Sequence, residues 1–203
     1  MHRETFFKNI TRFIYELGML KRHKHDGYAL AGVENLPSIA EHSLRAAQIA
    51  YILAFLEGYE RPEEVVTMVV FHDIEETRIP DINKVANRYV TIDKDSLFKE
   101  QLEERLGELG RRIRELREKV NYRYENNRAS LIAKDADYLE QAFTAKELYE
   151  RGYKDAWDWI NNVEKALRTE SARMLLEVMK NTSSTEWWHG LKKIDMFRKE
   201  TNK

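Results

Sequence analysis

The segment Phe71-His72-Asp73-Ile74-Glu75-Glu76 gathers an imidazole and three carboxylates at the end of a largely apolar run, Val65 to Phe71. On a helix, His72 and Glu76 would lie one turn apart on one face, and Asp73 would lie about 100° round from His72. Burying such groups without partners would cost on the order of several kcal/mol. They must therefore pair with one another and with the backbone, or hold a metal ion.

Polar side chains also interrupt two other apolar segments that should be helices: His42 in one, and Asp135 or Asp137 in a later one. A lone histidine in a core helix is usually a hydrogen-bonded structural residue. A histidine followed directly by aspartate, with another histidine before it and an aspartate after it, is a more specific ordering. The pattern predicts that these side chains meet in one metal site, with periodicity leaving Asp135 and Asp137 as alternatives.

The composition excludes several classes of protein. The 203 residues include 34 basic and 35 acidic side chains with a net charge of −1, a mixture that creates no general basic field, so we expect no nucleic-acid partner. No cysteine occurs, so any metal must bind nitrogen and oxygen. Charged residues interrupt the first twenty positions and no apolar run of about 18 residues follows. We therefore expect a cytoplasmic protein with no membrane partner.

The chain is predicted to be all-α. Its three prolines fall where a helix can begin or end, and 42% apolar residues suffice for the core of one domain. We place this domain at residues 1–180 and a C-terminal helical tail, packing on the same domain, at 181–203. Apolar residues at helical spacing predict long helices at about 4–20, 38–57, 62–76, 128–151 and 155–180.

Two segments carry more detailed expectations. Ser38-Ile39-Ala40-Glu41 fits a capping box, which defines the start of the second helix. Between Ala46 and Leu56 only Gln48 is polar, which predicts a helix covered on most sides. The apolar series from Leu102 to Val120 predicts a surface helix laid on the core, with a dimer-forming coil as the alternative.

The ordered pieces resemble the H…HD…D pattern of the HD-domain phosphohydrolase superfamily, from about Leu17 to Leu148, with the closest likeness to YfbR-type 5′-deoxynucleotidases. The matching pieces are Ala40-Glu41-His42-Ser43, His72-Asp73-Ile74-Glu75-Glu76 followed by Asp81, and Lys134-Asp135-Ala136-Asp137. The resemblance implies a single-domain HD-domain helical bundle. It also implies a set of metal ligands in which Asp137 is preferred over Asp135: His42, His72, Asp73 and Asp137.

The resemblance further implies roles around the metal. Glu76 would take part in catalysis, and Asp81 would act there and hold the sugar 3′-hydroxyl. Relatives place an arginine and a tryptophan before the first histidine to bind the 5′-phosphate and the sugar or base. Here Arg22 and Tyr28 correspond to them, and Lys24 or His25 are alternatives for the positive charge. Because tyrosine replaces tryptophan, phosphohydrolase activity is better supported than deoxyribose selectivity.

A mixed nitrogen and oxygen ligand set predicts one divalent ion: Co²⁺, Mn²⁺, Ni²⁺ or Fe²⁺, with Zn²⁺ and Mg²⁺ as alternatives. We expect His23 and His25 to be loop residues rather than ligands of a second ion. The predicted activity is hydrolysis of the 5′-phosphate of (deoxy)nucleoside monophosphates. The alternatives are an HD hydrolase of a triphosphate, cyclic nucleotide or guanosine tetraphosphate, and a non-catalytic metal-bound nucleotide sensor.

The likeness also implies a homodimer. The series from Leu102 to Val120 or the pair Trp187-Trp188 would contribute to its interface.

Overall fold

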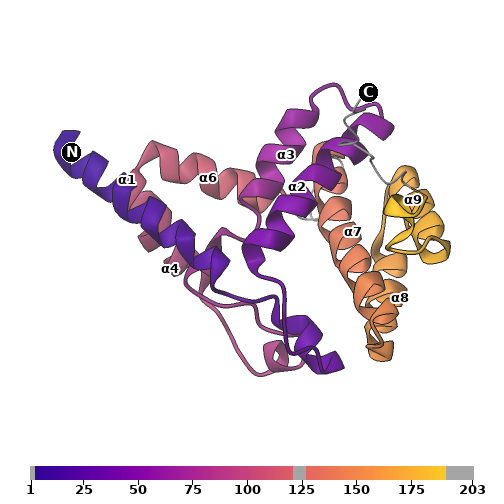
Figure 1. Cartoon of the computed structure of the whole chain (residues 1–203). Helices are drawn as coiled ribbons and strands as arrows, with labels where there is room; N and C mark the ends of the chain where they lie inside the picture. The colour runs from indigo at the N-terminus through magenta and orange to yellow at the C-terminus, as the bar shows by residue number, and fades with distance from the viewer. Residues whose placement is uncertain (1–2, 121–126, 191–203) are drawn as a thin grey trace, which may run out of the picture.

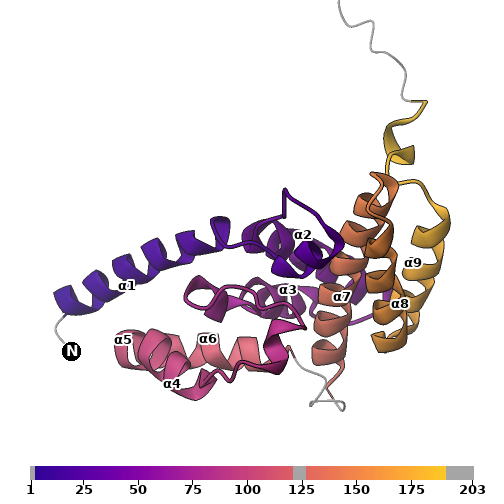
Figure 2. The same ribbon diagram turned by 90° about the horizontal axis from the view of Figure 1, so that it is seen from below.

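The computed structural model describes residues 3–120 and 127–190 (Figures 1 and 2). Within these ranges the protein is all-α and single-domain, as predicted, and the only β pairing is an isolated bridge between Lys24 and Ser38. The helices are α1 (Arg3–Leu17), α2 (Ile39–Leu56), α3 (Pro62–Val70), α4 (Lys94–Phe98), α5 (Glu104–Leu106), α6 (Glu108–Lys119), α7 (Arg128–Glu150), α8 (Trp157–Ala166) and α9 (Glu170–Asn181).

Helix α7 is the centre of the main core. Helices α2 and α3 pack on one side of it and α8 and α9 on the other, while α1 and α4–α6 project away from this group (Figures 1 and 2). Alanines on several sides of α7 are buried, which lets its neighbours approach closely. The chain therefore brings α2 and the end of α3 to one side of this helix and α8 to the other.

The start of α2 is fixed by the predicted capping box. Ser38 Oγ accepts a hydrogen bond from the Glu41 backbone N–H at 3.2 Å, and Glu41 Oε2 accepts one from the Ser38 backbone N–H at 2.6 Å. Gly58, with φ +60°, follows the end of the helix. These two boundaries place His42 within the first turns of α2.

The prediction that α2 is covered on most sides is wrong for its outer face. Large apolar side chains are half or more exposed along it, and Phe55 is 73% exposed. This exposed stripe consists of Leu44, Tyr51, Ile52, Phe55 and Leu56.

The third helix ends earlier than predicted. It stops at Val70, and His72 and Asp73 lie in a turn that leads into a 3₁₀ segment, Ile74–Thr77. The Val69 carbonyl accepts hydrogen bonds from both the backbone N–H of His72, at 3.3 Å, and its ring Nδ1–H, at 2.7 Å. In a continuing helix that carbonyl would accept from Asp73, so the histidine side chain competes with the helix.

The predicted last helix, 155–180, is also divided. Leu167 is extended, with ψ 140°, and separates α8 from α9. The Asp135 carboxylate accepts hydrogen bonds from the backbone N–H of Arg168 (3.1 Å) and of Thr169 (2.6 Å), and from Thr169 Oγ1 (2.7 Å). Asp135 thus stabilises the break between two helices, a structural role distinct from that predicted for Asp137.

The apolar series from Leu102 to Val120 forms no continuous helix. Gly107, with φ +58°, ends α5, and the chain turns back as α6 so closely that a Cβ on Gly110 would lie 2.2 Å from the Leu102 carbonyl oxygen. Three buried members of the series, Leu102, Leu106 and Ile113, join α1 and the turn after Asp73 in a second apolar cluster, whereas Val120 packs in the main core. That cluster contains Phe13, Ile74, Phe98, Leu102, Leu106 and Ile113.

The predicted tail is described as far as residue 190, and its remainder, 191–203, lies outside the described residues. Ser184 donates from its backbone N–H to Glu150 Oε2 of α7 at 2.9 Å. Trp187 and Trp188 belong to a short 3₁₀ turn and are exposed. No described helix has the length and apolar character that crossing a membrane requires.

Replacing Asp135 by asparagine should destabilise the protein, because one of the carboxylate's buried hydrogen bonds is lost and an amide N–H₂ then faces backbone donors. The side chain is completely buried, and we expect the free energy of unfolding to fall by about 1–3 kcal/mol. Urea titrations followed by circular dichroism measure this. Asp158→Asn, at an exposed carboxylate of α8, is the control and should change stability by less than about 0.5 kcal/mol. Equal stabilities for both variants would contradict the assigned role.

Candidate metal centre

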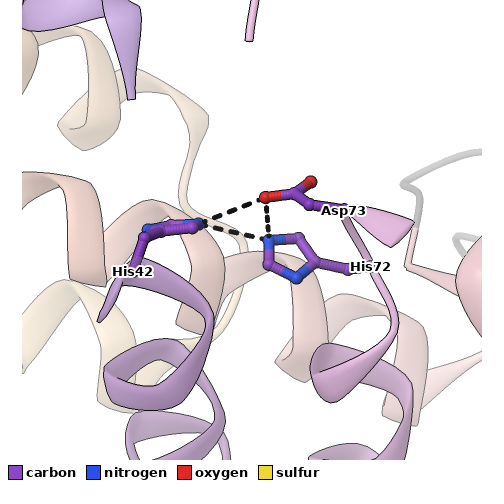
Figure 3. A group of neighbouring side chains, drawn as sticks. All are labelled: His42, His72 and Asp73. Atoms are coloured by element: carbon purple, nitrogen blue, oxygen red, sulfur yellow. Dashed lines mark hydrogen bonds and ion pairs between the residues drawn. The ribbon is translucent and has the colours of Figure 1, made fainter. Parts of the chain in front are cut away.

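Two imidazoles and two carboxylates from three parts of the chain converge at one point. His42 comes from α2, His72 and Asp73 come from the turn after α3, and Asp137 comes from α7. His42 Nε2 lies 3.2 Å from both His72 Nε2 and Asp137 Oδ1. Asp73 Oδ2 lies 3.0 Å from His72 Nε2 and 3.6 Å from His42 Nε2 (Figure 3). Asp137 Oδ1 and His72 Nε2 are 3.6 Å apart.

Hydrogen bonds from the Nδ1 atoms fix the orientation of the two imidazole rings. His72 Nδ1–H donates to the Val69 carbonyl at 2.7 Å, and His42 Nδ1–H donates to the buried carboxylate of Glu140. Each ring therefore presents Nε2 to the centre, where a neutral imidazole offers a lone pair. Arg45 Nε donates to Glu140 Oε1 at 2.9 Å and Arg45 Nη1 to Glu147 at 2.6 Å, so the carboxylate behind His42 is itself held.

Asp137 is held with one oxygen facing the histidines. Its Oδ2 accepts a hydrogen bond from Lys134 Nζ at 2.6 Å, and its Oδ1 accepts one from Gln141 Nε2 at 3.1 Å. Because Lys134 occupies Oδ2, only Oδ1 faces the two imidazoles. This arrangement favours a ligand that donates one oxygen.

The protonation equilibria show how these charges compensate each other. Burial opposes the charged imidazoles, but Asp137 raises the pKa of His42 well above its usual value, and Asp73 raises that of His72 to about 10. Burial likewise opposes ionisation of the carboxylates, yet Lys134 and the imidazoles hold the pKa of Asp137 well below its usual value, and His72 lowers that of Asp73. In the protein alone, protons supply the positive charge that this cluster requires.

The donor set fits a divalent cation. Ligand atoms about 2.1 Å from one ion and at right angles to each other would lie about 3.0 Å apart. The two imidazole nitrogens here lie 3.0 to 3.6 Å from each other and from the two carboxylate oxygens. His42, His72 and Asp73 by themselves form a group that could hold an ion. Two nitrogen and two oxygen donors suit Mn²⁺, Co²⁺, Fe²⁺, Ni²⁺ or Zn²⁺.

A pocket of about 550 Å³ opens beside this centre. Glu76 and Asp81 line it with His42, Asp73 and Asp137. Glu76 thus reaches the same pocket from the 3₁₀ segment, although the predicted helical spacing from His72 is wrong. The resemblance placed these two carboxylates near the predicted metal centre, and the structure brings them to its pocket by a different local conformation.

Glu76 has an unusual electrostatic environment. Its Oε2 is buried and has no hydrogen-bond partner among the described residues. Burial, reinforced by the neighbouring carboxylates of Asp73 and Asp81, raises the pKa of Glu76 to about 9. In the protein alone, Glu76 therefore carries a proton at neutral pH, and a cation beside Asp73 would lower its pKa.

The structure does not bring Arg22 or Tyr28 to the pocket. Arg22 is exposed, and its Nη1 lies 3.4 Å from Met19 Sδ. Tyr28 is only 1% exposed, and its hydroxyl donates to the Gln141 carbonyl at 2.8 Å. Residues 23–27 intervene between the two, and the chain turns the arginine outward and buries the tyrosine, so neither side chain lies where counting back from His42 placed it.

Other residues line the pocket instead. His25, which we expected to be a simple loop residue, has its ring centroid 4.7 Å from that of His42, and its Nδ1 lies 3.6 Å from Asp81 Oδ2. Lys134, Lys84 and Trp159 also line it and were not assigned from the sequence. Trp159, Asn162, Val163 and Ala166 fall at helical spacing, so periodicity shows that they share one face, but not that this face meets the histidines.

Comparisons with known proteins agree with this geometry. A family model described as "HD domain" matches residues 17–179. The chain belongs to the HD-domain family. This membership supports the metal-dependent hydrolase activity and the divalent cation that the sequence predicted. His42, His72 and Asp73, which converge in Figure 3, lie within the matched range.

Solved structures share this HD-domain fold. One structural-genomics protein is 31% identical, with a TM-score of 0.71, over 89% of this chain and 99% of its own. A conserved hypothetical protein from Pyrococcus furiosus is 26% identical, with a TM-score of 0.67, over 85% and 99%. A predicted metal-dependent phosphohydrolase from Magnetospirillum magnetotacticum shares the fold at 16% identity, with a TM-score of 0.59, over 89% and 94%. No curated protein matches the chain.

Replacing Glu140 by glutamine should weaken metal binding without removing a ligand. The substitution removes the negative charge that orients His42 and pairs with Arg45, and loss of such a partner typically costs about 10–100-fold in affinity. Titration with Co²⁺, followed by its visible absorption, measures the dissociation constant. Glu147→Gln also removes a partner of Arg45 but none of the histidines, so its affinity should stay near that of the unmodified protein. Equal affinities for both variants would argue against the role of Glu140.

Proposed function

We propose that this protein is a metal-dependent phosphomonoesterase that hydrolyses the 5′-phosphate of (deoxy)nucleoside monophosphates. The observation that carries the proposal is that His42, Asp73 and Asp137, which meet beside His72, line one pocket together with Glu76 and Asp81. A purely structural metal site would need neither of these carboxylates nor an open pocket of about 550 Å³. A nucleotide sensor would also need the pocket, but it would not need the buried carboxyl oxygen of Glu76, which has no partner in the described part of the chain and therefore favours an enzyme.

In this proposal His42, His72, Asp73 and Asp137 hold one divalent cation, with Co²⁺ and Mn²⁺ as the first candidates. When bound, such an ion neutralises phosphate charge and lowers the pKa of water. The protein's own groups then position the ester. Lys134 brings an ammonium group into the pocket beside Asp137 and takes over the phosphate contact expected of Arg22.

Proton transfer is assigned to Glu76. Its carboxyl lines the pocket, has a free oxygen among the described residues, and sits where burial favours the protonated form. It can therefore give a proton to, or take one from, a group in the pocket. Asp81 accepts a hydrogen bond from the Gly27 backbone N–H at 3.4 Å and keeps its place on the wall, where we assign it the sugar hydroxyl.

We also propose a homodimer, formed through the exposed stripe of α2. The Leu102–Val120 series offers little for an interface, since most of its apolar side chains are buried within the chain. The outer face of α2 carries no charged residue from Ala46 to Leu56. Such a face is self-complementary across a two-fold axis, because no like charges would meet there.

Purified protein should release phosphate from deoxy- and ribonucleoside 5′-monophosphates when Co²⁺ or Mn²⁺ is added, and chelation should abolish release. His72→Ala removes a proposed metal ligand. It should lower activity by more than the roughly 100-fold that is typical when a hydrogen-bond partner of a ligand is removed. Glu76→Gln should keep Co²⁺ binding but lower kcat by roughly 10²–10⁴-fold. Nucleotide binding without phosphate release, with every metal tried, would instead indicate a sensor.

Light scattering after size exclusion should give the mass of two chains for the unmodified protein. Phe55→Glu places a charge in the α2 stripe and should give a monomer. Trp187→Glu does the same at an exposed aromatic side chain of the tail, 77% exposed, and should leave the dimer intact. A dimer that survives Phe55→Glu but dissociates with Trp187→Glu would place the interface at the tail instead.

A further inference from the structure

The wall of the pocket that α8 forms has no part in holding the cation. Helix α7 lies between α2 and α8 (Figures 1 and 2), so the pocket extends from the histidines across α7 to α8. The α8 residues that line it are Trp159, Asn162, Val163 and Ala166. None of these is charged, whereas the two lysines that line the pocket come from the loop after Asp81, with Lys84, and from α7, with Lys134. This wall therefore suits an uncharged group of the substrate rather than further phosphates.

Trp159 is held rigidly by the residues behind it. Its ring packs on that of Tyr28, with centroids 5.4 Å apart and planes inclined by 36°. Tyr28 is fixed in turn by the hydrogen bond from its hydroxyl to the Gln141 carbonyl. Gly27 lies so close that an added Cβ would meet Trp159 Nε1 at 3.6 Å. The buried tyrosine thus supports the indole, which lines the pocket in its place.

The accessible part of the indole already lies against a cation. Lys84 Nζ lies 5.5 Å from the ring centroid and 3.7 Å from Asp158 Oδ2. The Lys84 side chain is 63% exposed, so it can move aside at small cost. An electron-rich ring face with a mobile neighbour is a suitable platform for another aromatic ring.

We propose that Trp159 binds the nucleobase of the substrate by stacking. This inference rests on the proposed nucleotidase function and names the part of the pocket that would hold the base. The phosphate would lie by the HD residues and Lys134, and the base would lie across α7 against α8. Stacking on an indole depends little on which base is present. We therefore expect the four common bases to be accepted with similar KM.

The first test compares Trp159→Leu with Trp159→Phe, using deoxyadenosine and thymidine monophosphates and, as an ester without a base, glycerol phosphate. Trp159→Leu should raise KM for both nucleotides roughly 10-fold or more, with little change for glycerol phosphate, and Trp159→Phe should restore most of the binding. Trp157→Leu is the matched control, since Trp157 lies on the same helix but packs on Tyr149. An unchanged KM in Trp159→Leu, or an equal loss with glycerol phosphate, would overturn the proposal.

The second test needs no turnover. Deoxyadenosine added to the protein without metal should quench tryptophan fluorescence, and Trp159→Leu should remove the quenching while Trp157→Leu retains it. Circular dichroism confirms that each variant is folded. If the unmodified protein hydrolyses no nucleotide, the proposed function fails, and this binding measurement still decides the role of Trp159: quenching that persists in Trp159→Leu would refute it.

Discussion

The packing of α2 against α7 is the contact on which the centre depends. It brings His42 to within 3.2 Å of Asp137 and joins the same histidine to Glu140 from behind. Both carboxylates come from one face of α7, three residues apart, so one helix supplies a candidate metal ligand and the group that orients the imidazole beside it. A shift of α2 relative to α7 would break the contacts of His42 with Asp137 and with Glu140 at the same time. Both helices contribute small buried alanines to the main core, which allows close packing.

Burying this much charge is tolerated because each group has a partner. Arg45 compensates Glu140, and Lys134 compensates Asp137. On the far side of the turn, the buried carboxylate of Glu75 accepts hydrogen bonds from Arg117 Nε at 3.0 Å and Lys94 Nζ at 2.9 Å. Glu76 is the exception, with an oxygen that no described residue satisfies. An unpaired buried carboxyl is costly in a structural site and useful in a catalytic one.

The turn that carries His72 and Asp73 is anchored from two directions. The Val69 carbonyl holds the imidazole from the α3 side. Ile74 and Glu75 hold the other side, the first in the cluster with Phe13 and the second through Arg117 of α6. The projecting group of α1 and α4–α6 thereby has a function in the site although it supplies no ligand. It keeps a non-helical turn in one conformation, which a metal centre needs for its donors to stay aligned.

The sequence alone determined the all-α class and the start of α2 at its capping box, because these follow from local spacing and residue chemistry. The resemblance to the H…HD…D pattern chose the histidines and aspartates that the structure brings together, including Asp137 over Asp135. Tertiary contacts decided the rest. Asp135 divided the last helix through partners 33 and 34 positions away. The burial of Tyr28 and the facing of Trp159 into the pocket likewise depend on how α8 packs on α7. Such contacts join residues distant in the chain, so no local pattern records them.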